Sequence, residues 1–112
     1  NALLAPELAV VLETDATKAR EIARKYMTTY TRLPNYTNNL KRFGWTDTDI
    51  EEINDRLVDA IVPVGDIDHV TSRIKAHLDA GASHVCVQVL NGAMNKMPYD
   101  EWKALAAAVK GL

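Results

Sequence analysis

Two apolar segments restrict the fold of this 112-residue chain more than any other feature. Residues 8–12 (LAVVL) and 84–90 (HVCVQVL) are apolar at both odd and even positions, apart from His84 and Gln88. A strand with one face in water alternates apolar and polar residues, whereas a strand inside a parallel sheet is covered on both faces. The two segments therefore predict buried parallel strands.

Helical patterns surround both predicted strands. Asp15 is a suitable N-cap for an amphipathic helix that continues to Tyr30 and stops before Pro34. Asp66 is suited to cap a second such helix, which Gly81 closes. A last amphipathic helix is predicted after Pro98. Strands that alternate with helices predict the α/β class with a parallel sheet.

The middle of the chain is less regular. Leu40 and Phe43 are predicted to anchor a short helix that Gly44 ends. The segment 48–51 (TDIE) has the pattern of a capping box with Glu51 as its acidic member. A single helix is expected to follow from it, through Ile53 and Leu57, until Pro63 and Gly65.

Composition and charge exclude several classes of function. The 13 Lys and Arg residues and 15 Asp and Glu residues give a net charge of -2, and no dense basic cluster indicates a nucleic-acid partner. No apolar run approaches the roughly 18 residues that a membrane span needs. A single cysteine cannot form an intrachain disulfide, and no secretory signal is recognisable, so a cytoplasmic protein is expected.

Several segments resemble a known family. They are residues 3–15 (LLAPELAVVLETD), 33–36 (LPNY), 39–40 (NL), 43–45 (FGW), 55–60 (DRLVDA), 65–66 (GD) and 79–90 (DAGASHVCVQVL). Together these stretches resemble the C-terminal part of luciferase-like monooxygenases, and most of all the actinobacterial oxidoreductases of that superfamily that depend on coenzyme F-420. The resemblance covers nearly the whole chain.

The resemblance implies a (β/α)8 barrel of the TIM type, in which residues 8–12 and 85–90 are the last two strands. A whole barrel needs roughly 250 residues, so residues 1–112 are expected to form a single partial domain, the C-terminal third. The parent protein would transfer hydride between coenzyme F-420, or alternatively flavin mononucleotide (FMN), and a small organic substrate. Most cofactor contacts in the family come from earlier strands, so this chain alone is expected to be inactive. The cofactor is expected in the parent protein, and the alternative for this chain alone is that it binds none.

A different function class follows from the strands themselves. Two parallel strands do not make an independent sheet of ordinary size, so they need neighbours from missing N-terminal barrel sequence or from another chain. Exposed strand edges favour pairing between chains. The alternative is therefore a homo-oligomeric, non-enzymatic α/β module that works by binding or as a structural element.

Candidate site residues follow from the rule that chemistry in such barrels lies at the carboxyl ends of the strands. Gln88 and Asn91 lie on or after the second strand, and Glu13 follows the first. Gln88 is predicted to bond either to a cofactor or substrate or to a structural partner, because burying an unpaired amide costs about 1–3 kcal/mol. Glu13 is either a pocket carboxylate or a favourable charge near the next helix N-terminus. Tyr36, in the segment between the strands, is a candidate for the pocket rim.

Other reactive side chains are interpreted as structural. Cys86 lies between two valines in a strand, which indicates a buried, inert thiol. His69, His77 and His84 are spaced too far apart for a zinc site, so surface positions are expected. The acidic residues of segment 47–52 lack the glycine of a calcium loop and are interpreted as helix N-terminal charge. No metal site is predicted.

Overall fold

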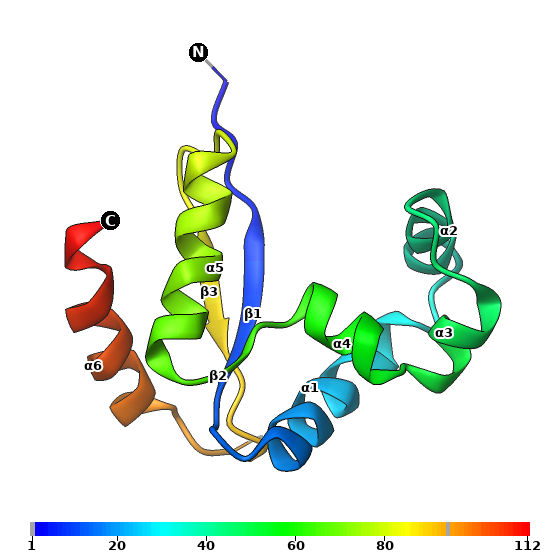
Figure 1. The fold of residues 1–112 in the computed structure, drawn as a ribbon, viewed down its shortest axis with the longest axis horizontal. Helices are drawn as coiled ribbons and strands as arrows, with labels where there is room; N and C mark the ends of the chain where they lie inside the picture. The colour runs from blue at the N-terminus through cyan, green and yellow to red at the C-terminus, as the bar shows by residue number, and fades with distance from the viewer. Residues whose placement is uncertain (1, 94) are drawn as a thin grey trace.

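A computed structural model describes residues 2–93 and 95–112 of the chain. Three strands and six helices, followed by a 3-10 turn, make up these residues (Figure 1). In chain order they are β1 (Glu7–Leu12), α1 (Ala16–Tyr30), α2 (Pro34–Arg42), α3 (Asp47–Glu52), α4 (Asp55–Ile61), β2 (Val64–Gly65), α5 (Ile67–Asp79), β3 (Cys86–Val89), α6 (Tyr99–Ala108) and η1 (Val109–Gly111).

The strands form one parallel sheet in the order β2-β1-β3, which confirms the predicted α/β class. β3 pairs along the first four residues of β1, with Ala9 opposite Gln88 and Val10 opposite Val89. β2 pairs only with the end of β1, where Val11 lies opposite Val64. The short β2 has no counterpart among the predicted strands, because two residues are too few to give an apolar pattern.

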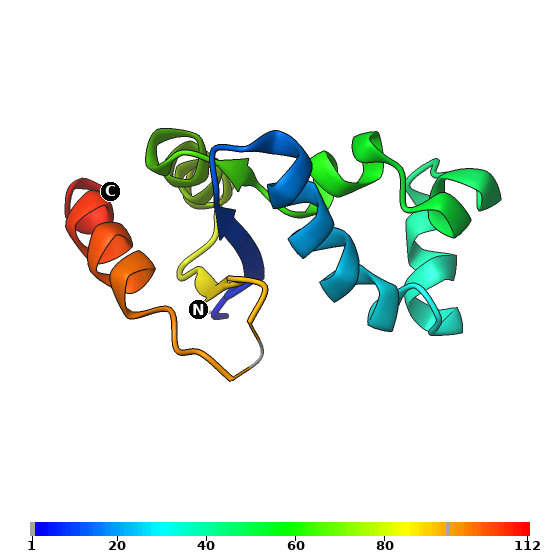
Figure 2. The same cartoon turned by 90° about the horizontal axis from the view of Figure 1, so that it is seen from below.

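β1 separates two hydrophobic clusters, because its successive side chains point to opposite faces. On one face, Ala9 and Val11 belong to a cluster with residues of α1 to α4, such as Met27 and Leu57. On the other face, Leu8 and Val10 belong to a cluster with residues of α5 and α6, which include Val70, Ile74 and Leu105. Figure 2 shows the resulting arrangement, with α5 and α6 on one side of the sheet and α1 to α4 extending away on the other. The prediction that residues 8–12 form a strand covered on both faces is confirmed.

Helix boundaries agree with prediction where a cap marks them. The Asp15 side chain accepts a hydrogen bond from the Lys18 backbone N–H at 3.1 Å, and Asp66 does the same for His69 at 2.8 Å. α1 ends at Tyr30, before Pro34, as predicted.

The single helix predicted over residues 48–60 is wrong. Thr46, not Thr48, begins the capping box, and its acidic partner is Asp49, not Glu51. α3 then stops at Ile53, whose backbone is left-handed (φ 45°), and Asn54 caps the separate helix α4. The apolar spacing continues across the break, which is why periodicity alone joins the two helices.

Two predictions of burial are also wrong. Phe43 does not anchor α2, since its side chain is 76% exposed, and Leu40 alone is buried there. Cys86 is exposed rather than buried. It lies opposite Glu7, on the same face of the sheet as Ala9 and Gln88. α1 and α4 cover Ala9 and Val11 on that face but leave the β3 side chains Cys86 and Gln88 exposed.

Candidate functional site

A hollow of about 510 Å³ lies between α1 and the chain that leaves the carboxyl end of β3. This volume lies within the roughly 300–1,000 Å³ of small-molecule sites. Ligands of parallel α/β sheets bind outside the carboxyl ends of the strands, which is the position of this hollow.

One face of α1 forms the first wall of the hollow. Each lining residue has another one three or four positions away, so they fall on one side of the helix: Ile22, Lys25, Tyr26, Thr29 and Tyr30. The neighbouring stripe of Ala19, Ala23 and Met27 is fully buried in the cluster with β1. The helix is thus fixed by one stripe and presents a second stripe to the hollow.

Residues 88–93 and 96–98 form the opposite wall. Asn91 organises this loop, because its side-chain oxygen accepts from the Ala93 backbone N–H at 3.0 Å and its amide donates to the Lys96 carbonyl at 2.9 Å. Gly92 lies against α1 with a left-handed backbone (φ 77°), and a Cβ placed on it would lie 3.1 Å from Ile22 Cγ1. The absence of a side chain at this position therefore allows the loop to approach α1 closely.

Tyrosine rings continue from the hollow along the molecule. The ring centroids of Tyr26 and Tyr30 are 5.0 Å apart, and those of Tyr30 and Tyr36 are 5.7 Å apart. Burial and the neighbouring Tyr30 hydroxyl raise the pKa of Tyr26, and burial raises the pKa of Tyr36. These two phenols therefore stay protonated at neutral pH and are able to donate hydrogen bonds.

The four predicted site residues have different surroundings. Gln88 and Asn91 both line the hollow. Tyr36 does not line the hollow, but its ring contacts that of Tyr30, which lines it. Glu13 lies outside it, where its Oε1 accepts from the Asp15 backbone N–H at 3.3 Å and its Oε2 is 4.0 Å from Lys18 Nζ. This agrees with the interpretation of Glu13 as a charge near the α1 N-terminus.

Gln88 differs from expectation in one respect. Its side chain is exposed, so it does not carry the cost of a buried, unpaired amide. Sequence reasoning also missed Lys25 and Lys96, which both line the hollow. The signal available for Lys25 was its neighbour Tyr26, since consecutive helix positions differ by only about 100° and can border the same hollow.

A smaller hollow of about 330 Å³ adjoins the first along β3 and shares Gln88, Val89 and Pro98 with it. Glu7, Cys86 and Trp102 also line this second hollow. Across the residues that the structure describes, no group of three or more His, Cys, Asp or Glu side chains is arranged to hold a metal ion. In the same residues, no helix has the length and apolar character to cross a membrane.

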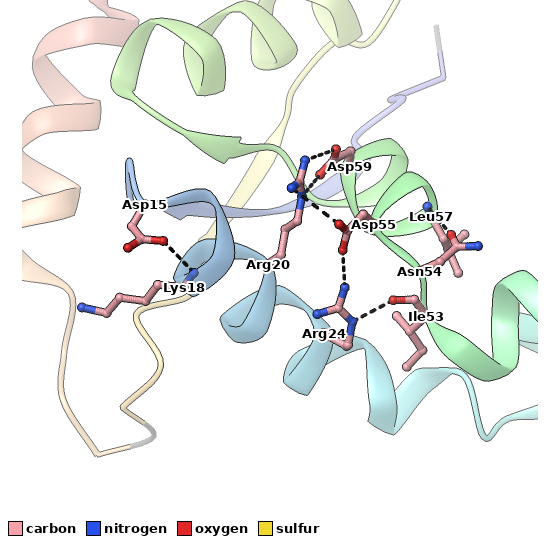
Figure 3. Close-up of polar contacts among 9 residues, drawn as sticks. All are labelled: Asp15, Lys18, Arg20, Arg24, Ile53, Asn54, Asp55, Leu57 and Asp59. Atoms are coloured by element: carbon pink, nitrogen blue, oxygen red, sulfur yellow. Dashed lines mark hydrogen bonds and ion pairs between the residues drawn. The ribbon is translucent and has the colours of Figure 1, made fainter.

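The side of α1 opposite the hollow is held by ion pairs to α4 (Figure 3). Arg20 donates two hydrogen bonds to the carboxylate of Asp59, at 3.0 and 2.8 Å. Arg24 donates to Asp55 at 2.6 Å and to the Ile53 carbonyl at 2.8 Å. These contacts fix the orientation of α1, and with it the wall of the hollow.

Comparison of the chain with protein-family models, with curated proteins and with solved structures finds no match. The family resemblance therefore rests on the sequence segments alone.

Proposed function

We propose that this chain forms the C-terminal part of the (β/α)8 barrel of a luciferase-like oxidoreductase. The parent enzyme transfers hydride between coenzyme F-420, or alternatively FMN, and a small organic substrate. The cofactor, when bound, supplies the hydride chemistry, while the protein orients the reactants and excludes water.

The observation that carries this proposal is the asymmetric cover of β3, since β1 has helices on both of its faces. α5 and α6 pack on the face that carries Leu8, Val10, Val87 and Val89. On the opposite face, the β3 side chains Cys86 and Gln88 are exposed. A barrel has its helices outside and closes its inner face with the other strands. On this proposal the exposed face of β3 would form part of the inner wall, next to the part of the same face that α1 to α4 cover at Ala9 and Val11.

The strand edges support the same arrangement. Within the described residues β3 pairs with β1 alone, so its outer edge is open. On the other side, β2 reaches only Val11 and Leu12, which leaves the first half of β1 without a neighbour there. A preceding strand and a first strand of a closed barrel would pair with these two edges.

The residues present fit one wall of a flavin-type site. The Gln88 amide is exposed on the uncovered face of β3, opposite the buried Ala9 of β1. Such a wall suits a planar ring with polar edges. Gln88 would hold the cofactor by a hydrogen bond, and the remaining contacts would come from strands that this chain does not contain.

Titration of the full-length protein with FMN and with coenzyme F-420, followed by cofactor absorbance and fluorescence, tests the proposal. We expect one of the two to bind, and replacement of Gln88 by Ala to weaken that binding by about threefold to tenfold, the value of one hydrogen bond. Asn39→Ala, on the exposed surface of α2, is the matched control and should leave the affinity unchanged. Binding of neither cofactor would refute the proposal.

The second candidate is the self-associating, non-enzymatic α/β module. The specific observation in its favour is that the open side of β3 carries no charge, since its sequence is CVQV. Native sheets commonly protect an open edge with charged residues or proline. An uncharged edge is suited to pair with a second copy of the chain.

A further inference from the structure

We propose that the hollow between α1 and residues 88–93 and 96–98 binds the substrate of this protein, and that the substrate is an organic anion with an aromatic body. All side chains that line the hollow belong to this chain. Only the description of the ligand as a substrate rests on the proposed oxidoreductase function.

Charge is the first support. Lys25 and Lys96 line the hollow from opposite walls, and none of its lining residues is acidic. Among the described residues, neither lysine takes part in an ion pair, whereas Lys18, Lys41 and Lys75 each have a carboxylate partner. Two cations without a counter-ion beside a concave surface attract an anion.

The position of Glu7 adds a direction to this attraction. Glu7 lines the adjoining hollow on β3, and its negative charge contributes to the raised pKa of Tyr26. An anionic group is repelled from that end. The acidic group of the ligand is therefore expected at the lysine end, and the neutral part of the ligand toward Gln88.

The aromatic walls are the second support. Tyr26 and Tyr30 line the hollow with rings 5.0 Å apart, and Ile22 and Leu90 add aliphatic surface. Aromatic pairs prefer such tilted or offset contacts, and a planar ligand is able to extend the series. Thr29 and Asn91 add polar groups of the kind that fix orientation in sites of this size.

Isothermal titration of the full-length protein with three probes tests the proposal. The probes are 2-naphthoate, its neutral amide 2-naphthamide, and the aliphatic anion hexanoate. At low salt, 2-naphthoate is expected to bind about tenfold more tightly than either of the others, because each lacks one of the two recognised features. The variant Lys25→Gln/Lys96→Gln should lose the preference for naphthoate over naphthamide. The matched variant Lys103→Gln/Lys110→Gln, in α6 and η1, should keep it.

Three results would overturn the proposal. They are equal affinity for naphthoate and naphthamide, equal affinity for naphthoate and hexanoate, or a preference that survives in Lys25→Gln/Lys96→Gln. Competition with saturating FMN is the fourth arm: displacement of naphthoate by FMN would assign the hollow to the cofactor and refute a substrate site. Failure of the oxidoreductase proposal is recognised separately, since it requires that neither FMN nor coenzyme F-420 binds, whatever naphthoate does.

Discussion

Gly92 is the residue at which the backbone most directly shapes the hollow. Its φ of 77° lies in the left-handed region, and an added Cβ would lie 3.1 Å from Ile22 Cγ1. Gly44 has a similar left-handed backbone (φ 96°), yet a Cβ there would have no atom within 4 Å. Substitution of Gly44 therefore costs only the strain of a left-handed backbone, whereas substitution of Gly92 adds a steric contact with Ile22.

Gly92→Ala is expected to destabilise the protein more than Gly44→Ala. Both variants carry the left-handed cost of about 1–2 kcal/mol, and Gly92→Ala adds roughly 1 kcal/mol or more for displacing α1 or the loop. The free energy of unfolding in urea measures both. In an Ile22→Ala background the extra cost should shrink, and an unchanged difference between the two glycine variants would contradict the contact explanation.

Asp49 is the residue that joins α3 to α4. Its carboxylate accepts from the Thr46 backbone N–H at 3.0 Å, from the Asn54 amide at 2.7 Å and from Arg56 at 3.0 Å. The hydrogen bonds from Thr46 and Asn54, with the charge of Arg56, lower the pKa of Asp49 from 3.8 to about 2. Arg56 in turn lies 4.4 Å from the centre of the Trp45 ring.

This lowered pKa predicts a pH dependence with a definite sign. The folded state holds the carboxylate ionised more strongly than the unfolded state, so the stabilisation is complete above about pH 4 and is lost as pH falls toward about 2. Asp49→Asn should be less stable than the unsubstituted protein at neutral pH, and the free energies of unfolding of the two proteins should converge near pH 2. Urea unfolding across this range measures the difference, and a gap that stays constant with pH would show that the charge of Asp49 is not responsible.

At the scale of elements, α1 combines three roles on three sides of one helix. Ala19, Ala23 and Met27 are buried against the core, Tyr26 lines the hollow, and Arg20 reaches α4. The position of the lining side chains therefore depends on the ion pairs behind them as well as on the core.

Asp59→Ala tests this dependence, because it removes the two-bond contact with Arg20. A partly buried bidentate pair is worth more than an exposed one, so we expect the melting temperature to fall by a few degrees. Lys75→Ala, which breaks the exposed pair with Asp79 on α5, is the control and should change it by less. Equal changes in differential scanning calorimetry would contradict a special role for the α1–α4 contact.

The elements could be predicted from sequence where a local signal determined them. The apolar run of β1 and the N-caps Asp15 and Asp66 are such signals, and each is confirmed. The break at Ile53 could not be predicted, because it depends on Asp49 and Asn54 stabilising a left-handed residue between two helices with continuous apolar spacing. β2 could not be predicted because only its pairing with β1 defines it as a strand.

The candidate site was predictable only in part for a related reason. The ends of the strands indicated Gln88 and Asn91, and both line the hollow. Lys25 and Lys96 come together only through the loop that Asn91 and Gly92 shape, which is a tertiary effect. The burial of Cys86 was overestimated for a similar reason. An apolar strand sequence indicates that both faces of the strand are buried in the assembled protein, but it does not identify the segment or chain that covers each face.

For the whole molecule, the open side of the sheet should determine behaviour in solution. α6 exposes aromatic surface next to β3, where Trp102 lines the second hollow together with Cys86. Tyr99 is 61% and Trp102 41% exposed, and their ring centroids are 5.5 Å apart in an edge-to-face contact. Such surface favours association when it is not covered by further sequence.

Residues 1–112 expressed alone are therefore expected to self-associate. Cys86→Lys places a charge on the open face, where it should shift the chain toward the monomer. Ala76→Lys, at an exposed position of α5, adds the same charge elsewhere and should not. Light scattering with size-exclusion chromatography under reducing conditions measures the mass. If the unsubstituted residues 1–112 are monomeric, the open face does not mediate self-association.

β1 also determines how the two halves of the molecule can communicate. Because Ala9 and Val11 belong to one cluster and Leu8 and Val10 to the other, a single six-residue strand is the wall common to both. Neighbouring residues of β1 therefore belong to different hydrophobic clusters. A labelled methyl at Val10 would sense the packing of α5 and α6, and one at Val11 the packing of α1 and α4. Exchange that both methyls sense at the same rate would indicate a motion in which the strand itself takes part.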